Sequence, residues 1–153
     1  MTLPAQIETI VLRRTLDASL ERVYRAWTEV SEIAQWWTCG EGRPGTILEF
    51  DLRVGGRMVV SFGNPGEEPS LNTSVYLEVV PHERLVFTMT RVKSGVVRAE
   101  TRCTVEFRAL GNQTEVVLTD TGIGGASNEK GWRPTLASLQ IFLQTAPGQF
   151  EGE

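Results

Sequence analysis

The chain has 153 residues, a length that fits one domain with a substantial core, and we expect a single domain over 1–153 whose ordered part covers about 7–145. Its 15 basic and 19 acidic residues give a net charge of −4, which favours neither a nucleic-acid partner nor an anionic membrane. No apolar run approaches the ~20 residues of a membrane span, no signal-peptide core precedes the first strand, and Cys39 and Cys103 lie too far apart for a disulfide scaffold. We therefore expect a cytoplasmic protein.

The first quarter of the sequence predicts a strand followed by two short helices. Alternating apolar residues predict a strand over 7–16. Ser19 is expected to cap the first helix and Ser31 the second, which covers 32–37. A loop rich in glycine follows at 39–45. The apolar residues of the first helix recur at helical spacing: Leu20, Val23, Tyr24 and Trp27.

The middle of the sequence predicts six further strands joined by hairpin turns. Alternation over 48–53 places Leu48 on the inward face, and Gly55-Gly56 is a hairpin turn because both positions tolerate positive φ. Consecutive hairpins predict an antiparallel sheet with the first strand at one edge. After the last strand, a flexible bridge to the final helix is expected over 122–126. The other inward residues are Phe50, Leu52, Met58, Val60, Phe62, Leu85, Phe87, Met89, Thr101, Cys103, Val105, Phe107, Val116 and Leu118.

The last helix is predicted over 129–144, with Ser127 or Asn128 as its N-cap. Pro134 is expected to fall near its first turn, and Gln140 lies beside its apolar stripe. The predicted fold is α+β: a curved seven-stranded antiparallel sheet wrapped around this helix, with two short helices between strands 1 and 2. The stripe consists of Trp132, Leu136, Leu139 and Leu143.

Five motifs occur in the same order as in a known family. They are the stretches 17–28, 36–37, 51–57 and 75–88, and then Thr119-Asp120-Thr121-Gly122 with Gly131-Trp132. This order resembles the activator-of-heat-shock-protein-90-ATPase homologue family, within the helix-grip (SRPBCC) superfamily of START lipid-binding domains and the birch-pollen allergen. The resemblance implies a small bacterial protein with a cavity under the long helix, often for a hydrophobic ligand. The co-chaperone role belongs to larger eukaryotic members, so a chaperone partner is not expected.

The leading hypothesis is non-covalent binding of a small hydrophobic or amphipathic molecule in a cavity of ~300–1,000 Å³ between the sheet and the last helix. Thr101, Asp120 and Gln140 are expected to provide the polar contacts. Neither a cofactor nor a metal is expected, and a homodimer is compatible with the sequence. The remaining predicted ligand-binding residues are Trp37, Phe50, Leu52, Met58, Val60, Phe87, Met89, Cys103, Leu118, Trp132, Leu136 and Leu139.

Asp120 is the one weak catalytic candidate. Its parity with Val116 and Leu118 directs it inward, where a carboxyl group can serve as acid, base or ligand anchor. The alternative is a frayed strand end, with Asp120 solvated or paired with an arginine. An isolated His82 in a tight turn is expected to be solvated, because one histidine without cysteine or carboxylate neighbours builds no zinc site.

Two further functions stay open beside the binding hypothesis, although we expect binding rather than catalysis. One is a cyclase, hydrolase or dehydratase-like enzyme that uses Asp120 as acid or base and Trp37 as a substrate wall. The other is a protein-interaction module with an exposed patch. Trp36, Trp37 and Trp132 form either an aromatic mouth of the cavity or part of the core.

Overall fold

The computed structural model describes residues 7–37, 45–63 and 66–145; the predicted loop containing Cys39 lies outside the described residues. It contains seven strands and three helices in the predicted order. The elements are β1 (Ile7–Leu16), α1 (Leu20–Thr28), α2 (Val30–Trp36), β2 (Thr46–Phe50), β3 (Arg57–Phe62), β4 (Ser70–Val80), β5 (Arg84–Lys93), β6 (Val96–Leu110), β7 (Gln113–Ile123) and α3 (Gly125–Thr145).

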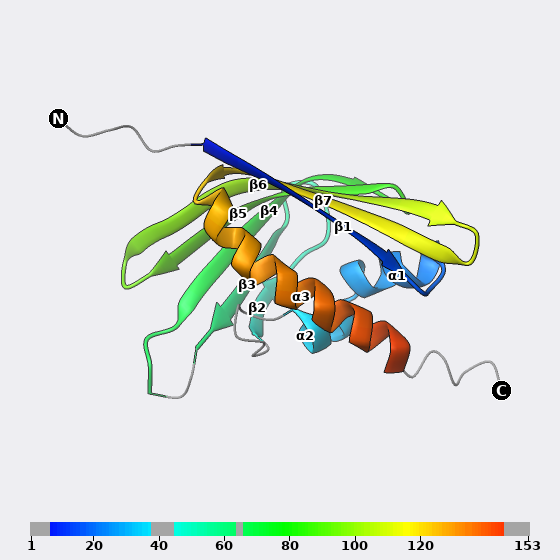
Figure 1. Cartoon of the computed structure of the whole chain (residues 1–153). Coiled ribbons are helices and arrows are strands. Elements are labelled where there is room, and N and C mark those ends of the chain that lie inside the picture. The colour runs from blue at the N-terminus through cyan, green and yellow to red at the C-terminus, as the bar shows by residue number, and fades with distance from the viewer. Residues whose placement is uncertain (1–6, 38–44, 64–65, 146–153) are drawn as a thin grey trace.

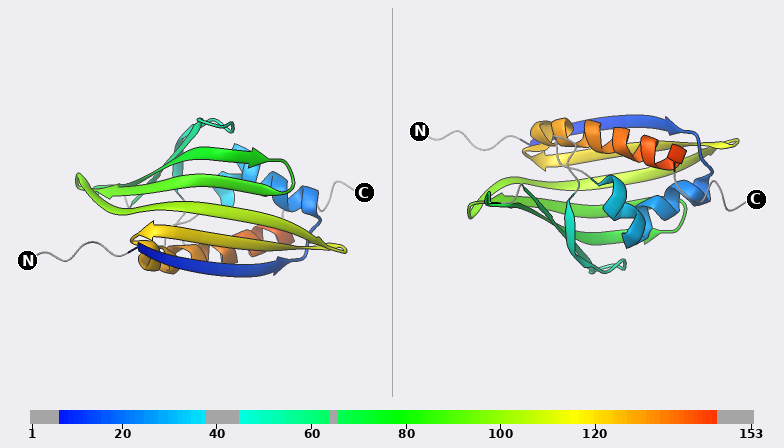
Figure 2. Two further views of the ribbon diagram at one scale, coloured as in Figure 1. Left: turned by 90° about the horizontal axis from the view of Figure 1, so that it is seen from above. Right: turned by 90° about the horizontal axis from the view of Figure 1, so that it is seen from below.

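The strands form one antiparallel sheet in the order β1-β7-β6-β5-β4-β3-β2, which confirms the predicted hairpins and places β1 at one edge. Sequential hairpins produce neighbouring strands because short turns leave no room for a crossover. All three helices lie on the same face of the sheet (Figure 1), which we call the inner face. Seen from below, α3 runs alongside β1 and β7, and α1 and α2 lie next to it at one end (Figure 2).

The inner face supplies most of the core. Alternating residues of the central strands are buried there with one side of α3, as the two-residue period of a strand requires. The exception is β2, where Leu48 is 60% exposed and its predicted inward position is wrong. A bulge between Ile47 and Glu49 inserts one residue, so Ile47 and Phe50 face the core instead.

The two short helices begin differently from one another. The Ser19 hydroxyl accepts a hydrogen bond from the Arg22 backbone nitrogen at 3.2 Å, which confirms the first predicted cap. Ser31 does not cap α2, because α2 already begins at Val30 and its first hydrogen bonds end on the Glu29 carbonyl oxygen. That prediction is wrong because only one residue separates the two helices.

The last helix begins earlier than predicted. The backbone nitrogen of Asn128 donates to the carbonyl oxygen of Gly124, so Ser127 and Asn128 lie inside the first turn and are not caps. No flexible bridge exists, because only Gly124 separates β7 from α3. Pro134 lies inside the helix, contrary to expectation, and removes one backbone donor. The helix continues because apolar residues on both sides of Pro134 are buried: Trp132, Leu136 and Leu139. Among the described residues, no helix has both the length and the apolar character needed to cross a bilayer.

Candidate functional site

Asp120 lies on the inner face, and none of its surface is exposed. Its Oδ2 atom accepts hydrogen bonds from Asn128 Nδ2 at 3.0 Å and from Trp132 Nε1 at 3.1 Å, both on α3. The inward position predicted from parity is therefore confirmed. The alternative of a frayed, solvated strand end is wrong, because β7 continues in register with both neighbours as far as Ile123.

Asp120 belongs to a group of polar side chains at one end of the inner face. Asn128 Nδ2 also approaches Thr101 Oγ1 at 3.4 Å, and Arg91 Nη2 donates to Asn128 Oδ1 at 3.4 Å. Arg91 pairs in register with Asn72 on β4, and Ser74 lies two residues further along the same face. We call the group the polar cluster and define it as Asn72, Ser74, Arg91, Thr101, Asp120 and Asn128.

Three oxygen atoms of the polar cluster are buried without a hydrogen-bond partner among the described residues. They are Asn72 Oδ1, Ser74 Oγ and Asp120 Oδ1, and their residues are 6%, 1% and 0% exposed. A buried polar atom left without a partner costs about 1–3 kcal/mol, so folded proteins pair nearly all of them. The inner face therefore keeps unmet hydrogen-bonding capacity at three points.

Burial also governs the chemistry of the groups next to Asp120. Cys103 faces Asp120 directly across β6 and β7. Burial, and to a lesser extent the charge of Asp120, raises the pKa of the Cys103 thiol, so the thiol stays protonated and is a poor nucleophile. Burial and the neighbouring charge of Arg98 lower the pKa of Arg91.

Most of the predicted ligand-binding residues meet in one place. Phe50 and Leu52 are partly buried and pack against the core, and Thr101 is buried in the polar cluster. Contact of these residues with a ligand stays a prediction. The others are buried members of the core: Trp37, Met58, Val60, Phe87, Met89, Cys103, Leu118, Trp132, Leu136 and Leu139.

Gln140 is the exception, because its side chain is exposed. The buried stripe of α3 includes Leu136, Leu139 and Leu143 and continues through Phe142. Successive residues of a helix rotate by about 100°, which leaves Gln140 just outside that stripe, so the prediction that it faces the sheet is wrong.

The tryptophans pack as a buried aromatic cluster. The ring centroids of Trp27 and Trp36 lie 4.7 Å apart, and those of Trp37 and Trp132 lie 5.2 Å apart. Phe107 contacts Trp27 from β6 at 6.1 Å. All of these rings are at most 5% exposed, so in this structure they form core and not an open mouth.

Sequence reasoning missed four members of the polar cluster as site residues. Asn72 and Ser74 were overlooked, although both lie on β4 and share the inward parity of Tyr76. Asn128 was assigned to a helix cap. Arg91 continues the parity of Met89 and carried the same signal, but it was not considered.

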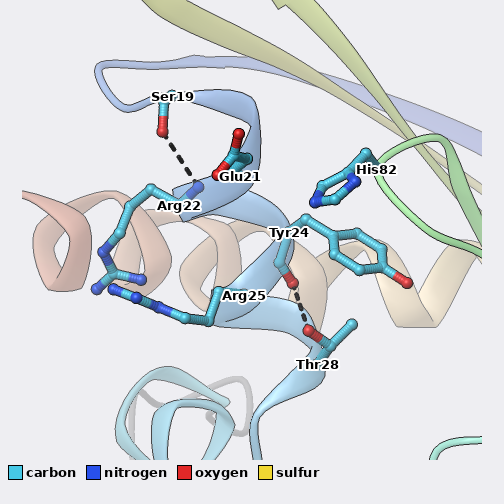
Figure 3. Close-up of a pocket in the computed structure, with 7 residues that line it drawn as sticks. All are labelled: Ser19, Glu21, Arg22, Tyr24, Arg25, Thr28 and His82. Carbon is cyan, nitrogen blue, oxygen red and sulfur yellow. Dashed lines mark hydrogen bonds between the residues drawn. The ribbon is translucent and has the colours of Figure 1, made fainter.

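A separate surface hollow of about 460 Å³ lies beside α1, at the end of the sheet away from the polar cluster. The ring of His82, which is exposed in its turn as expected, packs on Tyr24 at 5.0 Å. Arg22 and Arg25 point to the other side of α1 (Figure 3), where both contact Glu32. The hollow is lined by Ser19, Glu21, Arg22, Tyr24, Arg25, Thr28 and His82. Its charged groups do not converge on one point, so we do not assign it a ligand.

Within the described ranges, no group of three or more His, Cys, Asp or Glu side chains could hold a metal ion. The polar cluster contributes one carboxyl group from that set, and Cys103 beside it adds one thiol, which is fewer than the four ligands of a typical structural zinc site. Its chemistry is that of hydrogen bonding.

One antiparallel seven-stranded sheet with a long C-terminal helix on its inner face, and two short helices between β1 and β2, defines the helix-grip fold. Within this class, the chain belongs to the family described as Activator of Hsp90 ATPase homolog 1-like protein, which matches residues 17–144. The chain matches no curated protein.

Solved bacterial structures share the fold over nearly the whole chain. A protein from Rhizobium loti is 25% identical with a TM-score of 0.79, and the match covers 91% of this chain and 99% of that one. A protein from Chromobacterium violaceum is 29% identical with a TM-score of 0.78, covering 89% and 96%. One from Rhizobium leguminosarum is 24% identical with a TM-score of 0.80, covering 92% and 97%.

Proposed function

We propose that this protein binds a small amphipathic molecule non-covalently between the inner face of the sheet and α3. The observation that carries the proposal is the set of buried oxygens without partners: Asn72 Oδ1, Ser74 Oγ and Asp120 Oδ1. Folded proteins keep such atoms for a reason, such as a ligand or a water that completes their hydrogen bonds. The helix-grip fold is commonly a ligand-binding fold, and these atoms lie on its inner face.

The inner face is sorted by polarity along the strands, which supports an amphipathic ligand. The polar cluster occupies the end where β5 and β7 finish and α3 begins. Towards α1 the same strands present apolar residues, among them Leu118 and Val116 on β7 and Val105 on β6. A molecule lying along the strands would place its polar end at the polar cluster and its apolar part against these side chains.

Entry of a ligand to Asp120 requires α3 to move, because Asp120 Oδ1 is sealed from solvent and α3 packs on β7 at this carboxyl group. The first turns of α3 are held to the sheet by hydrogen bonds from Asn128 and Trp132 to Asp120. The unmet hydrogen bonds make the closed form less stable than a fully paired core would be, by about 1–3 kcal/mol for each atom. A ligand that completes them recovers part of that free energy and so favours the open form.

Two observations favour binding over catalysis. Asp120 faces a thiol that stays protonated, so the described part of the chain places no second acid–base group of comparable quality beside it. His82 lies in the turn between β4 and β5, at the α1 end of the sheet. General acid–base chemistry needs a group within hydrogen-bond reach of the reacting atom, and His82 does not meet that requirement for a molecule held at Asp120.

The proposal is tested with Nile red, a neutral dye whose emission rises in apolar surroundings. We expect saturable binding of one dye per chain. Leu136→Phe enlarges a buried side chain on the inner face of α3 and should weaken binding about tenfold by overpacking. Gln140→Phe adds the same ring on the exposed side of the same helix and should leave the affinity unchanged.

Urea unfolding of both variants controls for loss of fold. Dye binding that does not saturate, or that both substitutions change equally, would reject a site between α3 and the sheet. Mass spectrometry of small molecules that copurify with the protein from its native host then identifies the ligand.

A further inference from the structure

The unpaired atoms of the polar cluster specify a chemical class of ligand. Asp120 Oδ1 is an oxygen of a carboxyl group, Asn72 Oδ1 is a carbonyl oxygen, and Ser74 Oγ belongs to a hydroxyl that both donates and accepts. All three atoms can therefore accept hydrogen bonds, and two of them, Asp120 Oδ1 and Asn72 Oδ1, act as acceptors only. Exchanging the oxygen and nitrogen of an asparagine amide would change the character of Asn72, but a carboxyl group has no nitrogen to exchange. The atom at Asp120 Oδ1 is therefore an oxygen whichever way the side chain is turned, and the ligand class follows from this atom.

The donors around Asp120 are already engaged. Asn128 Nδ2 and Trp132 Nε1 both point at Oδ2, the other oxygen of the same carboxyl group. Arg91 Nη2 is directed to Asn128 Oδ1. The Cys103 thiol lies directly across the strands, yet Oδ1 forms no hydrogen bond with it. Within the described residues, no protein donor reaches Oδ1, which leaves this position to a water or to a donor group of the bound molecule.

We propose that the polar end of the bound molecule is a hydrogen-bond donor, a hydroxyl or an N–H group, that binds Asp120 Oδ1, and that molecules ending in a carboxylate are rejected. This inference rests on the proposed function. An ionised carboxylate offers only acceptors, so it leaves Oδ1 unpaired and places a negative charge against the Asp120 carboxyl group. The class is therefore an apolar alcohol, amine or amide, and not a fatty acid.

The position of Asp120 also sets the direction of the molecule. Asn72 and Asp120 are separated by β5 and β6, which corresponds to three strand spacings or ~14 Å across the sheet. Asn72 is also offset along β4 from Tyr76, the residue that lies in register with Asp120 through Cys103 and Phe87. One small polar group cannot reach both, and the hydrogen bonds from α3 converge at Asp120. From there the inward residues of β7 lead through Leu118 to Val116, so the apolar part of the ligand extends towards α1.

The test uses three probes with the same ten-carbon chain: 1-decanol, decyl methyl ether and decanoate. Calorimetry on the full chain at neutral pH should give the tightest binding for 1-decanol. The ether, which lacks only the hydroxyl proton, should bind roughly tenfold to a hundredfold more weakly, because it leaves Oδ1 unpaired. Decanoate should bind weakest.

Asp120→Asn provides the matched change at the protein side. The new carbonyl oxygen can keep accepting from Asn128 and Trp132, and the new amide nitrogen then takes the place of Oδ1. The unpaired acceptor becomes a donor, and the oxygens of the alcohol, the ether and the carboxylate can all accept from it. The variant should therefore lose the preference for 1-decanol and bind the ether and decanoate more tightly than the wild-type protein does. Gln140→Leu, on the exposed side of α3, should keep the order of the wild-type protein.

Each outcome decides one of the two claims. Equal affinities, or tightest binding of decanoate, overturn the donor assignment while the proposed function stands. A preference for 1-decanol that Asp120→Asn leaves intact overturns the role of Asp120. Failure of all three probes and of Nile red to bind rejects the proposed function and the inference with it. If Asp120→Asn does not fold, the order of the three probes on the wild-type chain decides.

Discussion

Two buried tryptophans allow the contribution of one side-chain hydrogen bond to stability to be measured. Trp132 Nε1 donates to Asp120 Oδ2, whereas Trp27 Nε1 is buried without a partner among the described residues. Both rings belong to the same aromatic cluster and are at most 3% exposed. The pair therefore separates the effect of the hydrogen bond from that of the ring.

We expect Trp132→Phe to lower the free energy of unfolding by about 1–3 kcal/mol more than Trp27→Phe. Both changes shrink a buried ring, but only Trp132→Phe takes a donor from a buried carboxyl group. Urea unfolding monitored by circular dichroism measures the difference. Equal losses in the two variants would show that the hydrogen bond to Asp120 contributes nothing to stability.

The buried thiol of Cys103 should make the stability of the protein depend on pH. Burial raises the pKa of this thiol above the ordinary value of 9.0, so the folded state holds a proton that the unfolded state releases. That contribution to stability is complete below pH 9.0 and is lost as the pH rises towards the folded-state pKa. Cys103→Ala should flatten the decline in stability just above pH 9, as measured by urea unfolding at a series of pH values. A decline as steep as that of the wild-type protein would contradict this assignment.

At the scale of elements, the junction between β7 and α3 is a single glycine. Gly124 has a φ of 83°, and a Cβ atom there would meet the Arg98 carbonyl oxygen at 2.9 Å. Gly111, in the turn between β6 and β7, has a φ of 63° and open space around it. Both positions require the left-handed region, but only Gly124 is also crowded by backbone.

Gly124→Ala should therefore destabilise the protein more than Gly111→Ala. Each substitution carries the left-handed penalty of roughly 1–2 kcal/mol, and only Gly124→Ala adds the displacement of β6 or of the start of α3. The two unfolding free energies, compared in urea, test this. Because α3 carries Asn128 and Trp132, Gly124→Ala should also weaken Nile red binding, whereas Gly111→Ala should not.

The elements that the sequence predicted well are those with a strong period. The hairpins from β3 to β7 were predicted because apolar residues alternate along most of these strands, and because glycines, or Pro81 between β4 and β5, mark the turns. The failures lie at element ends. The bulge in β2 reversed the parity of Leu48, and the first turn of α3 contains Gly125 and no apolar stripe that would reveal a helix.

For the molecule as a whole, the fold and its inner face were predictable, whereas the polar cluster was predictable only in part. Asp120 and Thr101 were found because they share the parity of apolar neighbours. Asn72 and Asn128 resemble loop and cap residues, since asparagine is common in both, and the inward parity of Asn72 follows only once the full extent of β4 is known. Their role depends on which strands lie side by side, and hydrophobic periodicity carries no information about that.

The pairing of β1 with β7 has a consequence for the order in which the chain can fold. The ten residues of β1 all pair with β7, and α3 also contacts β1. During synthesis β1 therefore stays unpaired until β7, the last strand of the sheet, has left the ribosome. Such a long-range contact forms late, because the conformational entropy of the long intervening chain has to be lost before the contact contributes any stabilisation. The proposed site between the sheet and α3 is completed in that same step, so a nascent chain cannot hold a ligand there before both β7 and α3 have been made.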